Sequence, residues 1–446
     1  MLKLFLWLRY LRKKKIVLLS IAAVALSAAL LIVVASLFNG FINAFERSAV
    51  ETLGDVVITP PIKFAKYSLF IEQLKQIRQV EAATATLLVP GLLHLGKGNV
   101  RAVEVWGIEP AARTRVTNFK RFLLRQSKSS EEPSFATPGF AEKVGGFLGI
   151  GVVAEPNKNT DEYDFGSAEK MIGQQVVLTT GTVTDTGAGG EGRFKRKTVG
   201  FTVADIVFTG IYEVDKTFIY LPLEELQKVL CPGQDGQIAH QVHIKLIDNA
   251  DADVALAKIW SLWEVFAAEQ LGWGSHLIGN TSIETSKQMQ SQYVAEFRKQ
   301  MGLLLLIFGV VSLSVILLIF CIFYMVVMTK QKDVAIIKSC GAADSSVAWV
   351  FIGFGACVGI VGSAAGAVLG YIVTKNINII EGWIRIIFGL KLWKSSVYMF
   401  SRIPNEVDWS AALVIVLAAI LAAVIGALVP AIVAIKTRPV NILRYE

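Results

Sequence analysis

Charged side chains are scarce in this chain. Only 18% of its 446 residues are Asp, Glu, Lys or Arg, whereas 53% are hydrophobic. Because an average soluble domain carries about 25% charged residues, this composition excludes an ordinary soluble enzyme and indicates an integral membrane protein. The formal net charge of +8 fits basic cytoplasmic loops. The basic residues gather on no single soluble face, so we expect no nucleic-acid partner.

Cysteine and histidine are also rare, with four of each. Cys231 is the one cysteine in the hydrophilic segment, so that segment holds no internal disulfide, although we expect it to face an oxidising compartment. His240 and His243 would point to opposite faces of a strand, and no third metal ligand lies near them in sequence. The sequence also lacks Walker A, HExxH and G-x-S-x-G motifs. It therefore predicts no metal site, no catalytic centre and no cofactor bound by this chain.

The chain does have four long apolar runs without a charge. They are Ile16–Phe38, Met301–Thr329, Ser345–Thr374 and Trp409–Ile435. Each exceeds the ~20 residues that cross a bilayer core, and the first is longer than the apolar part of a signal peptide. The sequence predicts an α-helical membrane protein with four transmembrane helices and a large mixed α+β extracytoplasmic domain between helices 1 and 2. The expected divisions are 1–44 (N-terminus and helix 1), 45–298 (extracytoplasmic domain) and 299–446 (helices 2–4 and the C-terminal tail).

The distribution of lysine and arginine predicts the orientation. Twelve basic residues place the N-terminus, the segment between runs two and three and the tail in the cytoplasm: Lys3, Arg9, Arg12, Lys13, Lys14, Lys15, Lys330, Lys332, Lys338, Lys436, Arg438 and Arg444. The loop between runs three and four should then lie outside, yet it is basic too, with Lys375, Arg385, Lys391, Lys394 and Arg402. We keep the orientation because the reverse would place the twelve outside. We expect Trp383, Phe388 and Trp393 to hold this loop in the membrane interface.

Residues 45–298 mix strand-like and helix-like patterns, which indicates an α+β domain. The predicted strands are Asp55–Thr59, Val100–Trp106, Gln175–Thr180, Phe201–Thr209, Thr217–Leu221 and Ala239–Ile247; the predicted helices are Ser68–Gln79, Leu223–Leu230 and Asp251–Leu271. Two segments read as insertions. Ser127–Asp164, rich in Ser, Glu, Pro and Lys, predicts a surface loop or a disordered arm. Thr182–Lys197 predicts a flexible hairpin tip, since Arg193-Phe194 stand where a phosphate loop needs Lys-Ser/Thr.

A short charged stretch, 329–341, separates the second and third runs. Lys330, Lys332, Asp333 and Lys338 predict its wet side, and 334–337 its apolar side. It is too short to cross the bilayer. A plain cytoplasmic loop held by its lysines and a handle gripped by a soluble partner both fit this pattern.

The third run carries glycines at four-residue spacing. They form two sets, Gly355 and Gly359, then Gly362, Gly366 and Gly370. Small residues in this spacing let two helices approach closely in a membrane. We expect them to pack against a neighbouring helix of this chain or of a partner, rather than to contact a substrate.

The stretch Asp333–Ala342, DVAIIKSCGA, resembles the coupling segment of LolC/LolE-type permeases, within the wider MacB/FtsX group. Further stretches resemble motifs of the same family: Asn39–Phe41 (NGF), Trp106–Pro110 (GI[DE]P), Phe208–Asp215 (F.TG.YE.D), Tyr220–Leu226, and the tail 430–446. The resemblance touches both ends, all four apolar runs and patches of the large domain. The segments 127–164 and 182–197 look unlike typical members.

The resemblance implies a permease subunit of an ABC transporter in the bacterial inner membrane, with its large domain in the periplasm. A separate ATPase, which would bind ATP and Mg²⁺, would drive release of lipoproteins from the outer leaflet; the chain itself would be non-catalytic. Further expected partners are a second copy or a paralogous permease, lipoprotein cargo, a periplasmic carrier and membrane lipids. The implied ATPase-coupling residues are Lys330, Lys332, Asp333, Ala335, Ile336, Lys338 and Gly341.

We also expect an acyl-chain slot where Leu37–Phe41 faces Leu303–Phe308. Its residues would be Phe38, Asn39, Gly40, Phe41, Leu305 and Phe308. Two other functions stay open: MacB-like export of peptides or amphiphiles, and FtsX-like mechanotransmission to a cell-wall hydrolase. The F.TG.YE.D segment and the lack of an ATPase domain in this sequence favour lipoprotein release over MacB-like export.

Overall fold

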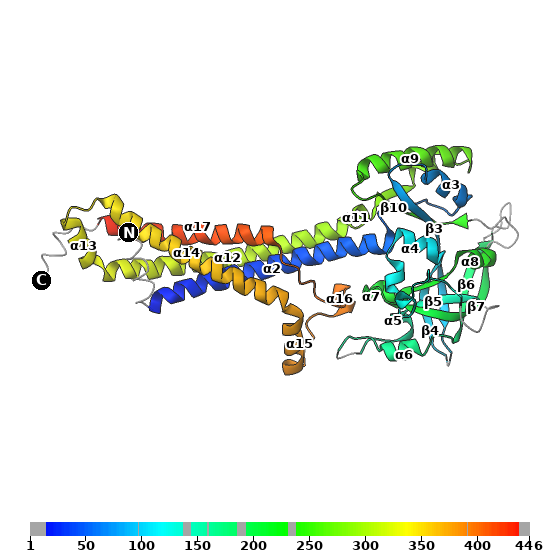
Figure 1. The fold of residues 1–446 in the computed structure, drawn as a ribbon, viewed down its shortest axis with the longest axis horizontal. Coiled ribbons are helices and arrows are strands. Elements are labelled where there is room, and N and C mark those ends of the chain that lie inside the picture. The colour runs from blue at the N-terminus through cyan, green and yellow to red at the C-terminus, as the bar shows by residue number, and fades with distance from the viewer. Residues whose placement is uncertain are drawn as a thin grey trace. The chain divides into compact units, whose positions relative to one another are not determined.

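The computed structural model describes residues 15–96, 98–136, 144–157, 160–184, 193–230, 238–389 and 391–436. The chain divides into two compact units (Figure 1), each described here by itself. The membrane unit comprises Met1–Asn43, Tyr293–Trp383 and Ile403–Glu446; the sheet unit comprises Ala44–Gln292 and Ile384–Arg402. Ile384–Arg402 therefore groups with the sheet unit, whereas the sequence-based division counted it with helices 2–4. Of the basic N-terminal residues only Lys15 is described, and Arg438, Arg444 and Cys231 lie outside the described residues. The predicted hairpin tip 182–197 is partly strand, since 182–184 pair with 193–195, and its residues 185–192 lie outside the described residues.

Four helices in the described part of the chain are long and apolar enough to cross a membrane, as predicted. They are α2 (Lys15–Leu53), α12 (Ser291–Thr329), α14 (Asp344–Lys375) and α17 (Trp409–Lys436). The helices α2 and α12 have 39 residues each, or about 58 Å at ~1.5 Å per residue. A hydrocarbon core is only ~30 Å thick. Both helices therefore continue well past their apolar runs.

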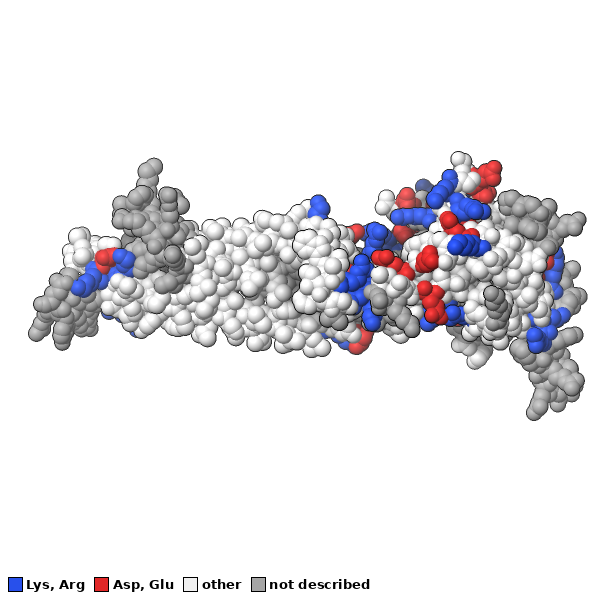
Figure 2. All heavy atoms as spheres, turned by 90° about the horizontal axis from the view of Figure 1, so that it is seen from below, with Lys and Arg blue, Asp and Glu red and all other residues white. Residues whose placement is uncertain are grey.

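The packing registers of the four helices agree with chain directions that alternate across the membrane. The helix α14 runs parallel to α2, since Gly362 lies against Val24 and Gly370 against Ile32. It runs antiparallel to α17, since Gly355 meets Ala427 and Gly359 meets Ala423. Ser27 pairs with Ser312 and Phe41 with Phe297, which makes α2 and α12 antiparallel. Figure 2 shows few charges over the middle of these helices.

Two shorter helices complete the connections between the spans. They are α13 (Gln331–Ser339), between α12 and α14, and α15 (Ile377–Phe388), after α14. The helix α15 is amphipathic, and Ile379, Trp383, Ile386 and Ile387 are 57–78% exposed. Such a helix is typical of a membrane interface.

The sheet unit is built on one mixed sheet. Its strands are β1 (Val56–Thr59), β3 (Val80–His94), β4 (Val100–Ile108), β5 (Gly145–Gly149), β6 (Gln175–Thr184), β7 (Arg193–Val207), β8 (Phe218–Pro222), β10 (Gln241–Leu246) and β11 (Ser282–Thr285). A small second sheet pairs β2 (Phe64–Ala65) with β9 (Ile238–Ala239). The order in the large sheet is β11-β1-β10-β3-β4-β8-β5-β7-β6. Among the described strands, β3 also pairs with β6, so β3, β4, β8, β5, β7 and β6 close into a barrel.

Helices pack on the open part of this sheet and on the barrel. The longer ones are α3 (Tyr67–Leu74), α4 (Pro110–Val116), α8 (Leu223–Leu230) and α9 (Ala252–Glu269); the shorter ones are α5 (Ile150–Val153), α6 (Phe165–Glu169), α7 (Tyr212–Thr217), α10 (Ser275–Gly279), α11 (Ser286–Met289) and α16 (Ser395–Tyr398). Two 3-10 turns lie at Phe119–Phe122 and Gln126–Lys128. Trp263 of α9 is fully buried, with its ring 5.2 Å from those of Phe64 and Phe70. This aromatic group helps to hold α3 and α9 on the sheet.

The interpretation of 127–164 as a loop or disordered arm is wrong for its second half. Residues 145–149 form β5, a buried strand between β7 and β8. The reason lies in its glycines: a Cβ at Gly146 would lie 2.6 Å from the Phe201 ring, and one at Gly149 would lie 2.4 Å from the Asp215 carbonyl oxygen. A strand in such tight surroundings needs glycine. Its composition therefore resembles that of a loop.

Candidate functional site

The helix α13 lies between the second and third spans and packs on the ends of the long helices. Val334 and Ala335 are buried, and Val334 contacts a cluster that includes Val347 and Ala431. Gly341 follows the helix with a φ of +90°, the left-handed conformation that ends many helices. One face of α13 is thus bound to the rest of the membrane unit.

The two sides of α13 agree only in part with the sequence prediction: Lys332 and Asp333 are exposed and Val334 and Ala335 are buried, as predicted. Lys338, expected on the wet side, is only 12% exposed; its Nζ lies 2.7 Å from Asp344 and donates to the Ile435 carbonyl oxygen at 2.7 Å. Lys330 forms an ion pair with Asp333. Ile336 and Ile337, expected on the apolar inner side, are 53% and 47% exposed. The prediction was wrong here because the contacts with α14 and α17, not the helix's own pattern, decide which side faces inward.

The outer surface of α13 is therefore partly apolar. Large exposed side chains on a short charged helix are typical of a protein contact rather than of a solvated loop. Lys338 links α13 to the start of α14 and to the end of α17. Ile336 and Ile337 form the exposed apolar part of the helix surface.

The glycines of α14 lie at two helix contacts within the membrane unit. Gly355 and Gly359 face α17, where added Cβ atoms would lie 2.5 and 2.9 Å from alanine side chains. Gly362, Gly366 and Gly370 face α2, and a Cβ at Gly366 would lie 2.6 Å from the Ala25 carbonyl oxygen. These distances show that the helix backbones approach each other closely. Helices in a membrane associate through such close packing, because the hydrophobic effect does not drive them together there.

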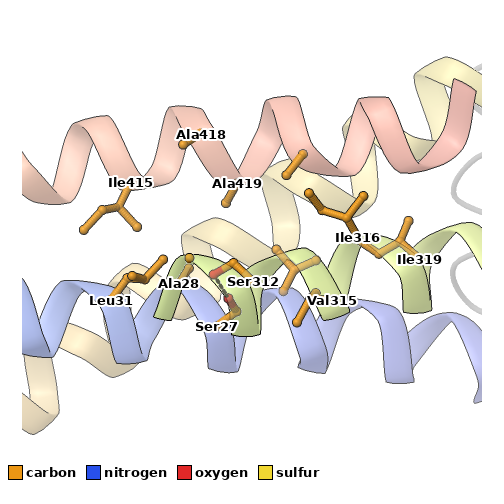
Figure 3. A pocket seen from close by; sticks show the side chains of 13 residues that line it. Ser27, Ala28, Leu31, Ser312, Val315, Ile316, Ile319, Ile415, Ala418 and Ala419 are labelled. Carbon is orange, nitrogen blue, oxygen red and sulfur yellow. Dashed lines mark hydrogen bonds between the residues drawn. The ribbon is translucent and has the colours of Figure 1, made fainter. Parts of the chain in front are cut away.

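An apolar crevice of about 260 Å³ lies between α2, α12 and α17 (Figure 3). Leu31, Val315, Ile316 and Ala418 are among its lining residues. The polar side chains in its wall are Ser27 and Ser312, whose hydroxyl oxygens lie 2.9 Å apart and bond to each other. With these two groups paired, the crevice offers an apolar ligand a surface of low desolvation cost.

The two runs predicted to form an acyl-chain slot do not face each other. Phe41 packs on Phe297, with ring centroids 4.9 Å apart. Asn39 donates to the Asp408 carboxylate at 2.6 Å, and Gly40 lies beside Pro404. Phe38, Leu305 and Phe308 are half-buried. The pairing of residues 27 with 312 and 41 with 297 sets a register that sequence alone could not give, and it places the crevice at other residues.

Within the sheet unit, the end of α2 is held by buried polar groups that the sequence analysis missed. The guanidinium of Arg113 donates to the Thr52 carbonyl oxygen at 2.5 Å, and the Nδ1–H of His243 donates to the Leu53 carbonyl oxygen at 2.8 Å. Ser286 Oγ donates to the Gly54 carbonyl oxygen at 2.5 Å. These bonds satisfy carbonyl groups that a buried helix end would otherwise leave without partners.

The charge of Arg113 suits this position. It lies at the negative end of the helix dipole and 4.9 Å from the centre of the Trp106 ring. Burial lowers the pKa of Arg113 to about 10. Burial and the nearby Arg113 charge also lower the pKa of His243 well below its ordinary value, so the imidazole is neutral. The end of span one is thus bound into the sheet, as is β11, the strand before α12, through its pairing with β1.

The Phe208–Asp215 stretch forms a compact turn around a buried carboxylate. Asp215 accepts from the Thr209 backbone N–H at 2.7 Å, the Thr209 hydroxyl at 2.8 Å and the Gly210 N–H at 3.0 Å. Burial raises the pKa of Asp215 to about 7. The turn presents Ile211 and Tyr212 to the loop 384–402, where Tyr212 N–H donates to the Met399 carbonyl oxygen at 2.9 Å.

Residues 305–439 match the family model for the FtsX-like permease C-terminal domain. The match includes α13, the glycine helix α14 and the helix α17. The membrane unit, with its apolar helices and a connecting helix that has an exposed apolar side, is therefore similar in its C-terminal part to FtsX-like permeases.

The chain is similar to LolC and LolE permeases over most of its length. It is 25% identical over 450 residues to the lipoprotein-releasing system transmembrane protein LolC of Neisseria meningitidis serogroup B, covering 98% of each chain. It is 24% identical over 431 residues to LolE of Haemophilus influenzae, covering 95% of this chain and 93% of that one. The periplasmic region of MacB from Actinobacillus actinomycetemcomitans matches 55% of this chain and 95% of its own length, with 14% identity and a TM-score of 0.32. At that level the last similarity supports no inference.

Proposed function

We propose that this chain is the transmembrane permease subunit of an ABC transporter that releases lipoproteins from the outer leaflet of the bacterial inner membrane. The observation that carries the proposal is the alignment with LolC, a lipoprotein-releasing protein, across 98% of both chains. An alignment that spans the helices and the sheet unit together supports a shared overall task. The four spans and the interfacial helix α15 agree with a multi-pass membrane location.

In this proposal the chain itself hydrolyses nothing. A separate ATPase binds ATP and Mg²⁺ and docks on α13. Ile336 and Ile337 supply the exposed contact, while Lys338, paired with Asp344 and the end of α17, transmits the movement to the spans. We propose that Lys332 and Gly341 also contribute to the contact with the ATPase, as the sequence predicts.

The acyl chains of the cargo would enter the crevice between α2, α12 and α17. The wall is apolar and the two serines are already paired, which suits a hydrocarbon chain better than a peptide backbone with free polar groups. A bulky side chain at the crevice should compete with the cargo. We expect Ala418→Phe to lower lipoprotein release several-fold, and Leu417→Phe, on the lipid-exposed side of the same helix, to leave it unchanged.

A second permease and a periplasmic carrier complete the proposed assembly. Within the membrane unit only 6% of the most apolar stretch of α12 is buried, against 50% for α14. Leu303, Leu306 and Val310 of α12 are 59–64% exposed. A second copy or a paralogous permease would cover part of this surface, and lipid the rest.

Affinity purification of the chain from bacterial membranes in mild detergent tests this function. We expect mass spectrometry to find an ATPase, a second permease subunit and an acylated protein in the retained material. An outer-membrane conduit or a cell-wall hydrolase in place of acylated cargo would instead support MacB-like export or FtsX-like mechanotransmission. Absence of any ATPase from an intact complex would overturn the role given to α13.

A further inference from the structure

The loop 384–402 begins in the end of α15 and stops shortly before α17. It is joined to the segment 160–162, which lies elsewhere in the sheet unit. Lys391 Nζ lies 3.6 Å from the Asp161 carboxylate and donates to the Thr160 carbonyl oxygen at 2.5 Å. The Asp161 carboxylate also accepts from the Ser395 backbone N–H at 2.6 Å. The two charged side chains are only 9% and 13% exposed. A charge this well buried, if left without its partner, costs several kcal/mol.

Backbone hydrogen bonds close the turn that carries Asp161. Asp161 has a φ of +52°, and its N–H donates to the Asn157 carbonyl oxygen at 2.6 Å. Asn157 N–H in turn donates to the Glu162 carbonyl oxygen at 3.0 Å. Asp and Asn adopt the left-handed conformation more easily than most residues. The backbone of the turn thus supports the position of the carboxylate that Lys391 contacts.

A second contact holds the loop at the Asp215 turn. Phe400 pairs with Ile211 in an antiparallel bridge, and its ring lies 6.5 Å from that of Phe45. The loop is closed on itself as well: Trp393 stacks on Tyr398 at 4.2 Å and donates to the Phe400 carbonyl oxygen at 2.9 Å. The loop is therefore a defined body, not a loose connection.

The two ends of the loop are also bound to each other. In the membrane unit, Asn378 donates to the Ile403 carbonyl oxygen and accepts from the Ile403 N–H, each at 3.0 Å. Asn378 lies in α15, directly after α14, and Ile403 lies shortly before α17. A pull on the loop therefore acts on spans three and four together.

These contacts explain two oddities of the sequence with one arrangement. The loop is basic although it belongs outside, and the segment 127–164 looks unlike the family. In the structure the basic residues Lys391 and Arg385 pair with the acidic residues Asp161 and Glu162 of that segment. Two of the basic residues in this region therefore have local acidic partners.

We infer that Asp161 and Lys391 are positioning residues that attach the loop 384–402 to the rest of the sheet unit. Through this attachment, spans three and four move the sheet unit together with spans one and two. Only the second half of this inference, the movement of the sheet unit by the spans, rests on the proposed transport function. The attachment itself can be measured without transport.

Chymotrypsin cleavage after Trp393, Tyr398 or Phe400 measures the attachment. The full-length chain is used, in detergent with its co-purified partners. We expect Asp161→Asn and Lys391→Gln each to speed cleavage by about tenfold or more. Because both remove the same interaction, the double variant should be little faster than either single one. Lys391→Arg should restore most of the protection. Arg385→Gln is the matched control, since its pair with Glu162 is 30% and 71% exposed and contributes little.

The transport half of the inference is tested on the same variants. We expect the rate of ATP hydrolysis to stay within about twofold of wild type, while lipoprotein released per ATP falls several-fold in Asp161→Asn and Lys391→Gln. Unchanged cleavage in both single variants would overturn the attachment. Faster cleavage with an unchanged yield per ATP would overturn the positioning role. If the wild-type complex releases no lipoprotein at all, the proposed function fails while the cleavage result stands.

Discussion

The two units are stabilised in opposite ways. The sheet unit has a large apolar core in which Trp263, Phe70 and Leu148 are almost inaccessible to solvent. The membrane unit has small buried clusters, contacts made by glycine and alanine, and long helices whose apolar side chains stay exposed. In water, burial drives folding; in lipid, close packing replaces it. The sheet unit therefore buries most of its large apolar side chains within itself, whereas the membrane unit keeps many of them exposed, where lipid and partner proteins can cover them.

The comparison predicts the largest loss of stability when a methyl group is added at a tightly packed glycine of the sheet unit. In Gly149→Ala the new Cβ would meet the Asp215 carbonyl oxygen at 2.4 Å, and backbone cannot move aside easily. We expect a loss of about 3 kcal/mol in local stability. Hydrogen exchange of β5 and β8 in the full-length chain measures it. Gly200→Ala, where a Cβ meets no atom within 4 Å, is the control and should change little. Equal effects at both positions would argue against tight packing at β5.

In the membrane unit a larger residue should act through helix separation. We expect Gly366→Leu to push α14 from α2 and to cost about 2 kcal/mol in resistance to denaturation by detergent. The control is Gly302→Leu on α12, where a Cβ meets no atom within 4 Å. If both variants denature alike, the glycines of α14 make no special contact.

Partner binding should depend on the exposed side of α13. We expect Ile336→Glu to lower the amount of co-purified ATPase about tenfold, or ~1.4 kcal/mol, because a carboxylate replaces an apolar contact. Val265→Glu on α9 is closely matched, since Val265 is 52% exposed and Ile336 is 53% exposed. Full ATPase recovery with Ile336→Glu would show that the partner binds elsewhere.

The last prediction concerns a pH dependence confined to the sheet unit. Burial raises the pKa of Asp215 from 3.8 to about 7. Between these values the folded protein holds a proton that the unfolded chain has released, so stability falls as pH rises, by at most about 1.4 kcal/mol per pH unit. Asp215→Asn should flatten this part of the profile. Hydrogen exchange at several pH values, corrected for intrinsic rates, would show it; an unchanged slope in the variant would assign the titration to another group.

The parts of the fold that follow local rules could be predicted from the sequence. The four spans are long runs without charge, and α8 begins and ends where its pattern predicts. The barrel was harder to foresee. The strand β3 contains Pro90 and Gly91, which read as a turn, and β5 is rich in glycine because its neighbours leave no room for side chains. Local composition conceals such strands.

The candidate functional surfaces, too, could be predicted from the sequence only in part. The position of α13 follows from its charge and length, yet its outward side could not be predicted, because Lys338 faces inward to bind the end of α17. The crevice depends on the register between α2 and α12, for which Ser27 and Ser312 give no signal in sequence. Arg113 and Asp161 act through partners 61 and 234 residues away. Contacts of that range are set by topology.

The most direct test of the central claim is ATP-driven release in a reconstituted system. The chain, its co-purified ATPase and any second permease are placed in proteoliposomes with an acylated lipoprotein. A soluble carrier is added outside. We predict that the acylated protein moves to the carrier only with ATP and Mg²⁺, and that the same protein made without its acyl chains is not transferred. Transfer that ignores acylation, or ATP hydrolysis without any transfer, would contradict the account.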